Sequence, residues 1–196
     1  MLSTTLSALL FLAAAASGDE IVKKATPLKS LDDFLDSYMG ECAKGDPDQI
    51  AECKEASKKF RAEAKGKTFL VDVPSKVVAR LTPVQSKQTD VLVYEFTPFF
   101  DGGGFGMSFE KPKLSGDSPV VRRQNLKIPA PKNPDDESPI LEAVKVDRVG
   151  VQLVFTPMEM WKLPKKKGGA WYGLQVKPIL LRLTDQRSEE KADTVF

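Results

Sequence analysis

The alternation of apolar and polar residues is clearest over residues 90–112 (DVLVYEFTPFFDGGGFGMSFEKP), where it predicts a β-hairpin. Successive residues of the first arm, VLVYEFTP, are expected to face opposite sides, and Phe105, Met107 and Phe109 alternate with small or polar residues on the return. Pro98 cannot donate a ladder hydrogen bond, so we expect it to end the first strand or to lie on an edge. The glycines that follow Asp101 give the backbone the freedom that a reversal needs. The pattern therefore predicts one hairpin with an aromatic, glycine-rich tip.

A looser copy of this pattern occurs downstream, in residues 149–157 (VGVQLVFTP) and 168–176 (GGAWYGLQV). Each copy runs from an apolar strand that ends in Phe-Thr-Pro, through an aromatic loop, to a return that contains two adjacent glycines. In this correspondence, Gly106-Met107 matches Gly173-Leu174. Two copies are too few for a solenoid, so the repeat predicts paired hairpins in one sheet or barrel.

Helical periodicity replaces alternation over residues 19–66. Ser30 is the predicted N-cap of a first helix, whose apolar residues recur at spacings of three and four, and the polar residues before it are expected to be extended. Asp46 is the predicted N-cap of a second helix, with Pro47 at its first position and Gly66 at its end. The two helices are short and close in sequence, which predicts an α-helical hairpin.

The two cysteines of the chain lie in this hairpin, Cys42 in its loop and Cys53 on its second helix. In an exported protein an even pair of cysteines predicts a disulfide, because oxidising compartments retain such bonds. The alternatives are two free, partly buried thiols or a redox-active dithiol. A zinc site is not expected, since the chain has no histidine and no Cys-x-x-Cys spacing.

Export is predicted from residues 6–16 (LSALLFLAAAA), which are uncharged and mostly apolar. The run is shorter than the roughly 20 residues that span a bilayer, and it fits the apolar region of a secretory signal followed by small residues. We expect cleavage after Ala16 or Gly18. Residues 1–18 are then a signal peptide, and the mature protein is periplasmic or secreted, without a membrane span.

From residue 67 onward, short apolar strands separated by glycine and proline predict an antiparallel β domain over residues 67–184. The proline-rich segment 129–139 is expected to be a long excursion within that domain. A change of alternation near Pro178 predicts a β-bulge. Residues 185–196 are charged and aperiodic, so we expect a disordered tail.

The predicted fold class is α+β: an N-terminal helical hairpin over residues 19–66, followed by a mainly antiparallel β-barrel or sandwich. Gly66-Lys67 leads into the strand TFLVDV, and with the strands that follow it residues 58–110 resemble the OB-fold-like domains of exported bacterial proteins. The whole chain also resembles uncharacterised secreted bacterial proteins. The first resemblance implies an OB-like barrel, and neither implies an activity.

The composition narrows the class of function. Of 196 residues, 41% are hydrophobic and 29% are charged, and the net charge is only +2. A chain so nearly balanced gives no electrostatic reason to expect nucleic acid or an anionic membrane as a partner. With no histidine, the usual nucleophilic triad is unavailable, and Glu95 is expected to face solvent. The sequence therefore predicts neither an enzyme nor a cofactor.

Two acidic segments offer oxygen ligands, Asp101 beside its glycines and the run Asp135-Asp136-Glu137. Neither has the ligand spacing of an EF-hand calcium loop. Solvated loops account better for both, so no metal site is predicted.

Six aromatic residues concentrate near the two predicted hairpin tips, and they are the candidate binding residues. Aromatic rings in such positions stack on sugars or bases, or insert into a protein partner. The alternative is that they fold over one end of the β domain and close its core. Lys165, Lys166 and Lys167 adjoin the second tip, as either a basic-aromatic patch or a solubilising loop. The six aromatic residues are Phe99, Phe100, Phe105, Trp161, Trp171 and Tyr172.

These observations predict an exported, non-enzymatic protein of the cell envelope that engages a protein partner through its aromatic hairpin tips. The alternative is a small-ligand or glycan-binding β-barrel domain. A protein partner predicts an exposed apolar patch at the tips, whereas a small ligand predicts a concave pocket with convergent polar groups.

Overall fold

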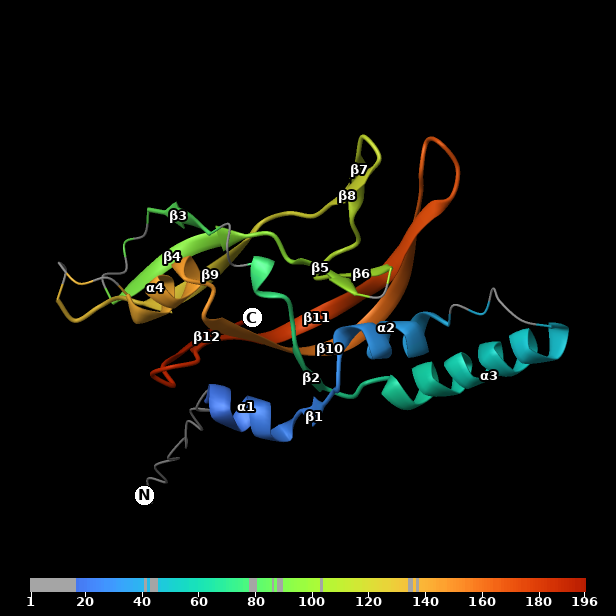
Figure 1. Ribbon diagram of the computed structural model, residues 1–196, viewed down its shortest axis with the longest axis horizontal. Coiled ribbons are helices and arrows are strands. Elements are labelled where there is room, and N and C mark those ends of the chain that lie inside the picture. Colours follow the sequence, from blue (N-terminus) through green and yellow to red (C-terminus); the bar gives the residue numbers. More distant parts are fainter. Residues whose placement is uncertain are drawn as a thin grey trace, which may run out of the picture.

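The computed structural model describes residues 17–40, 42, 46–77, 81–85, 87, 90–102, 104–133, 136 and 138–196. Most of the predicted signal peptide lies outside these residues, as do Gly103, Asp135 and Glu137. The described chain is α+β, as predicted, with helices grouped beside one large sheet (Figure 1). None of its described helices is both long and apolar enough to cross a membrane.

The largest sheet has seven strands among the described residues, in the order β1-β2-β10-β11-β6-β5, with β12 also paired to β11. The pairs β1·β2 and β6·β11 are parallel, and the others are antiparallel. The two ends of this order, β1 and β5, do not pair with each other in the described structure, so the sheet is not closed into a barrel. Its strands are β1 (Thr26–Pro27), β2 (Phe69–Asp72), β5 (Phe99–Gly102), β6 (Phe105–Ser108), β10 (Val149–Pro164), β11 (Ala170–Asp185) and β12 (Lys191–Val195).

The centre of the sheet is the long antiparallel hairpin of β10 and β11, 16 residues in each arm. Two register shifts interrupt it. At the first, Val154 pairs with Leu180 and Phe155 with Pro178, which leaves Ile179 as an extra residue and confirms the bulge predicted near Pro178. The second lies on β10, between Pro157 and Met160.

The prediction of a single hairpin over residues 90–112 is wrong, because the chain changes sheets within it. Strand β4 belongs to a second sheet, and the hairpin in the main sheet is the shorter pair β5–β6. Pro98 lies at the change, where it ends the ladder that β4 makes with β9. The second sheet, in the order β3-β4-β9, comprises β3 (Thr82–Val84), β4 (Val91–Phe96) and β9 (Gln124–Pro129).

The predicted helical hairpin is confirmed as α2 (Leu31–Met39) and α3 (Pro47–Ala64). Ser30 caps α2 by accepting the Asp33 N–H at 3.0 Å, and Asp46 forms a capping box with Gln49 at the start of α3. Cys42 and Cys53 form the predicted disulfide.

The core extends from these helices across the large sheet to the second sheet, where Leu126 and Ile128 of β9 are fully buried. The Phe34 ring of α2 is its junction, with ring centroids 5.2 Å from Phe69 on β2, 5.5 Å from Phe155 on β10 and 5.8 Å from Phe60 on α3. These contacts hold α2 against the middle of the sheet, while the outer halves of β10 and β11 continue beyond it (Figure 1).

Two segments are more ordered than predicted. The polar residues from Asp19 onward, expected to be extended, begin with a helix, α1 (Gly18–Lys24), because Ser17 and Glu20 make a capping box and Asp19 forms an ion pair with the buried Arg182 at 2.8 Å. The expected disordered tail contains β12, which pairs with β11 over Leu180–Thr184. Buried Ala192 and Thr194 anchor it, so the prediction of disorder over residues 185–196 is wrong.

The remaining elements are short. Within the segment 129–139, β9 ends at Pro129 and α4 begins at Pro139. Strands β7 and β8 form a separate two-stranded hairpin. These elements are η1 (Ser75–Val77), β7 (Lys113–Ser115), β8 (Ser118–Val120) and α4 (Pro139–Lys145).

Candidate functional site

The six candidate aromatic residues divide into a buried and an exposed group. Phe100 and Trp161 are 1% and 3% exposed and belong to the protein interior, as the alternative interpretation expected. Tyr172 is 42% exposed, and the others are half-buried. The residues that retain surface are Phe99, Phe105, Trp171 and Tyr172.

Trp161 is an internal support for the long hairpin. Its indole N–H donates to Ser108 Oγ at 3.1 Å, and its ring lies 6.1 Å from that of Phe99. The indole covers Gly106 and Gly173: a Cβ on Gly173 would collide with it, and a Cβ on Gly106 would collide with the Phe99 ring and lie 3.0 Å from the indole. The two glycines are register partners on β6 and β11, so the space for the indole explains why both positions lack a side chain.

Asp117, in the turn between β7 and β8, joins two hairpin tips that are far apart in the sequence. Its backbone carbonyl accepts the indole N–H of Trp171 at 2.7 Å, and its carboxylate accepts the backbone N–H of Lys166 at 3.1 Å. Figure 1 shows the β7–β8 and β10–β11 hairpins extending from the same side of the molecule. One residue therefore fixes the position of the second tip against the first.

Two lysines lie over aromatic rings of the β10–β11 hairpin. Lys165 Nζ is 4.0 Å from the ring centroid of Trp171, and Lys162 Nζ is 5.2 Å from that of Tyr172. Residues 110–123 and 158–177 together carry nine basic and three acidic side chains, a net of +6, although the whole chain has only +2. The joined tips thus concentrate positive charge that the net charge of the chain conceals.

Exposed apolar side chains continue this surface along β10 and β11. Met158 and Met160 are 54% and 48% exposed, and Lys162 pairs directly with Tyr172 across the hairpin. Because side chains alternate between faces, Met160 and Lys162 lie on the same face as Tyr172. We call the following residues the tip surface: Met158, Met160, Lys162, Lys165, Lys166, Lys167, Trp171 and Tyr172.

A cavity of about 350 Å³ lies at the base of the β7–β8 hairpin. Glu110 and Arg122 form an ion pair at 2.7 Å at its wall. The backbone N–H of Arg122, at 2.6 Å, and its guanidinium hold the pKa of Glu110 below its ordinary value. The cavity is lined by Glu110, Lys111, Lys113, Val120, Val121 and Arg122.

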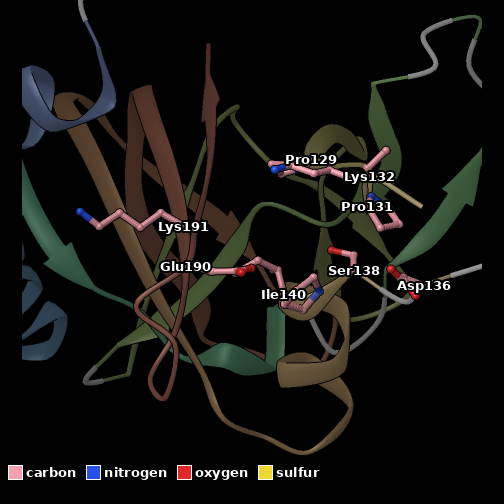
Figure 2. Close-up of a pocket in the computed structure, with 10 residues that line it drawn as sticks. Pro129, Pro131, Lys132, Asp136, Ser138, Ile140, Glu190 and Lys191 are labelled. Carbon is pink, nitrogen blue, oxygen red and sulfur yellow. The ribbon is translucent and has the colours of Figure 1, made fainter. Parts of the chain in front are cut away.

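A second cavity, of about 370 Å³, lies beside α4 (Figure 2). Prolines and Ile140 form its apolar part, and the Glu190 side chain points toward Ile140. The Lys191 side chain points away from the cavity, in agreement with its ion pair to Asp19 at 3.3 Å. None of the six candidate aromatic residues lines either cavity. The residues that line the second cavity are Pro129, Ala130, Pro131, Lys132, Asp136, Ser138, Pro139, Ile140, Glu190 and Lys191.

The acidic residues considered for calcium or catalysis are separate from one another. Asp101 is exposed on β5, Asp136 lines the larger cavity, and Glu95 is half-buried in an ion pair with Arg123 at 3.2 Å. Within the residues that the structure describes, no three acidic or cysteine side chains gather closely enough to hold a metal ion.

Sequence reasoning missed four residues of the joined tips. Asp117 lies in the turn SGDSP, and a turn does not reveal which other loop it contacts. Met158, Met160 and Lys162 follow the second Phe-Thr-Pro, where the strand was expected to end. It instead continues to Pro164, and the alternation of apolar and charged residues in MEMWKLP (158–164) is the signal that extends it.

Residues 2–193 match the model of a family of unknown function (DUF6066), so the chain belongs to that family. No curated protein and no solved structure matches the chain. The description of the family names no activity.

Proposed function

We propose that this member of the DUF6066 family is an exported, non-enzymatic binding protein of the cell envelope, which engages a protein partner through the tip surface. The observation that carries the proposal is the junction at Asp117, which holds two basic hairpins together. A surface fixed in this way loses little conformational entropy when a partner binds.

The composition of the tip surface favours a protein as the partner. Tyr172 combines a large apolar ring with a hydroxyl group, a combination that is enriched where interfaces have their strongest contacts. Met158 and Met160 are flexible apolar side chains that adapt to the shape of a partner. The surrounding lysines favour a partner that is acidic at the contact, by electrostatic complementarity.

Export to the periplasm or the exterior is supported by the disulfide between Cys42 and Cys53. Such bonds persist in oxidising compartments and are rare in the reducing cytosol. The apolar run over residues 6–16 supports the same location.

The alternative, a small-ligand or glycan-binding domain, places the ligand in a cavity. The larger cavity has the apolar prolines and the few polar groups that such a site needs. The aromatic residues expected to stack on a sugar do not line it, which makes this the second candidate.

The test is photocrosslinking in the producing cell, with a benzophenone amino acid in place of Tyr172. The matched control carries the same group in place of Lys58, an exposed residue of α3. We expect a discrete protein adduct from position 172 alone, weakened when Lys166→Glu and Lys167→Glu are added. Identical adducts from both positions, or none from either, would contradict the proposal. A retained small molecule in native mass spectrometry would favour the alternative.

A further inference from the structure

The outer half of β10 has an open edge in the described structure. Strand β2 covers β10 only over Gln152–Phe155. From residue 156 to residue 164, the described part of the chain pairs β10 with β11 alone. An edge of this kind presents unpaired N–H and C=O groups to a further strand.

The hydrogen bond that closes the β10–β11 hairpin shows which backbone groups of β10 face outward, away from β11. The Lys165 N–H donates to the Gly169 carbonyl at 3.0 Å, so Lys165 faces β11. Along a strand, successive residues direct their backbone groups to opposite sides. Leu163 and Trp161 therefore also face β11, and the N–H and C=O groups of Met160 and Lys162 face outward.

Two prolines limit the length of this edge. Pro157 and Pro164 have no N–H, and the register shift after Pro157 breaks the alternation before Met160. These features protect the strand from long edge-to-edge association. They leave a window of two residues, Met160 and Lys162, that offers both donors and acceptors.

The charge around this window selects the kind of segment that fits it. Lys162 is exposed within the window, and Lys165, Lys166 and Lys167 follow at the tip. Glu159 is the acidic residue of β10 beside it. A strand laid along the edge would thus place its side chains beside four lysines and one glutamate, which favours acidic residues.

We infer that an extended, acidic segment of the protein partner adds to the outer edge of β10, with backbone hydrogen bonds to Met160 and Lys162. The inference rests on the proposed function and specifies how the partner is held. In strand addition of this kind, main-chain hydrogen bonds provide affinity and the neighbouring side chains provide specificity.

Lys162→Pro and Lys162→Gln make a matched pair of variants. Both remove the charge, but only proline removes the outward N–H, and a proline is tolerated at an edge where that N–H has no partner within the fold. The probe is a ten-residue peptide of alternating Glu and Val, with a Lys–Val peptide of the same length as its control. Binding is measured by titration of the full mature chain.

We expect the Glu–Val peptide to bind and the Lys–Val peptide not to bind. Lys162→Gln should weaken binding about threefold, through the lost charge. Lys162→Pro should weaken it about tenfold more, because a hydrogen bond is also lost. In the unaltered protein, bound Glu–Val peptide should slow hydrogen exchange at the Met160 and Lys162 amides, a readout that holds even if Lys162→Pro fails to fold.

Equal binding by the two variants, with no slowing of exchange at these amides, would overturn strand addition. If the crosslink at Tyr172 persisted in that case, the tip surface would still be the binding site and only the mode of binding would be wrong. Failure of the Glu–Val peptide to bind at all would also overturn the inference. Loss of the Tyr172 crosslink, by contrast, would remove the proposed function itself.

Discussion

Gly106 and Gly173 lie opposite each other on the parallel strands β6 and β11, and the indole of Trp161 covers both. These are the same two positions that correspond in the internal repeat of the sequence. The return segments of the two copies therefore lie side by side in one sheet, whereas β4, the strand before the first Phe-Thr-Pro, belongs to the second sheet. Each return segment contributes one glycine beside the buried Trp161.

Gly173→Ala tests whether the Trp161 indole requires a residue without a side chain at position 173. A Cβ at this position would collide with the Gly106 carbonyl and the Trp161 ring, so we expect a loss of about 1–3 kcal/mol in the free energy of unfolding. Urea unfolding measures it. Gly150→Ala on β10 is the control, since its Cβ meets only ordinary contacts, and it should change stability by less than about 0.5 kcal/mol. Equal effects would show that the indole moves aside.

Trp161→Ala and Tyr172→Ala should separate the structural aromatic residues from the binding ones. Removing the buried indole leaves a cavity and takes away the hydrogen bond that Ser108 Oγ accepts from it, although the Ser108 hydroxyl still donates to the Glu110 carbonyl at 2.7 Å, so the loss should be about 3–5 kcal/mol. Removing the exposed Tyr172 ring should cost less than about 0.5 kcal/mol. Thermal unfolding of the two variants measures the difference. A large loss for Tyr172→Ala would place that ring in the fold and withdraw it from the tip surface.

Asp117→Ala should loosen the junction of the two tips without unfolding the domain. The variant removes the carboxylate that accepts the Lys166 N–H but keeps the backbone carbonyl that accepts from Trp171. We expect faster hydrogen exchange at the Lys166 amide and a change in unfolding free energy within about 0.5 kcal/mol. Unchanged exchange at Lys166 would mean that Trp171 alone fixes the junction.

Asp185 should make the protein sensitive to acid. Hydrogen bonds from Arg148 at 2.7 and 3.2 Å, together with the Arg187 N–H and the Ser188 hydroxyl, hold the pKa of this carboxyl well below its ordinary value of about 3.9. A lowered folded-state pKa contributes stability above about pH 4, and the contribution is lost as the pH falls toward the folded-state value.

Asp185→Asn should therefore lower stability at neutral pH and flatten its decline below about pH 4, as measured by urea unfolding across that range. Asp101→Asn, at an exposed carboxylate of β5, should leave the decline as it is in the unaltered protein. If the decline keeps its steepness in Asp185→Asn, another carboxylate causes it.

The parts of the fold that the sequence predicted well are those set by local chemistry. Ser30, Asp46 and Pro47 mark helix starts through their own hydrogen bonds and geometry, and Cys42 and Cys53 are brought together by the short hairpin between them. The bulge beside Pro178 is visible because alternation is a local property.

The predictions that failed concern segments whose structure depends on partners far away in the sequence. Pro98 marks the end of a strand, but nothing near it shows that the next strand joins another sheet. The tail looked disordered because the partners that order it, Lys127 for Thr194 and Arg182 for Asp193, come from β9 and β11. The burial of Trp161 has the same kind of cause, since the space for its indole depends on glycines from two other strands.

The central strands β10 and β11 come from residues 149–185, the last quarter of the chain. During synthesis, helices α1 to α3 and strands β1 to β6 therefore leave the ribosome before the central strands of the domain exist. Domains fold as units during synthesis, so we expect this one to stay unfolded until its final strands emerge. In the export that we propose, this order of synthesis would leave the polypeptide extended while it crosses the membrane.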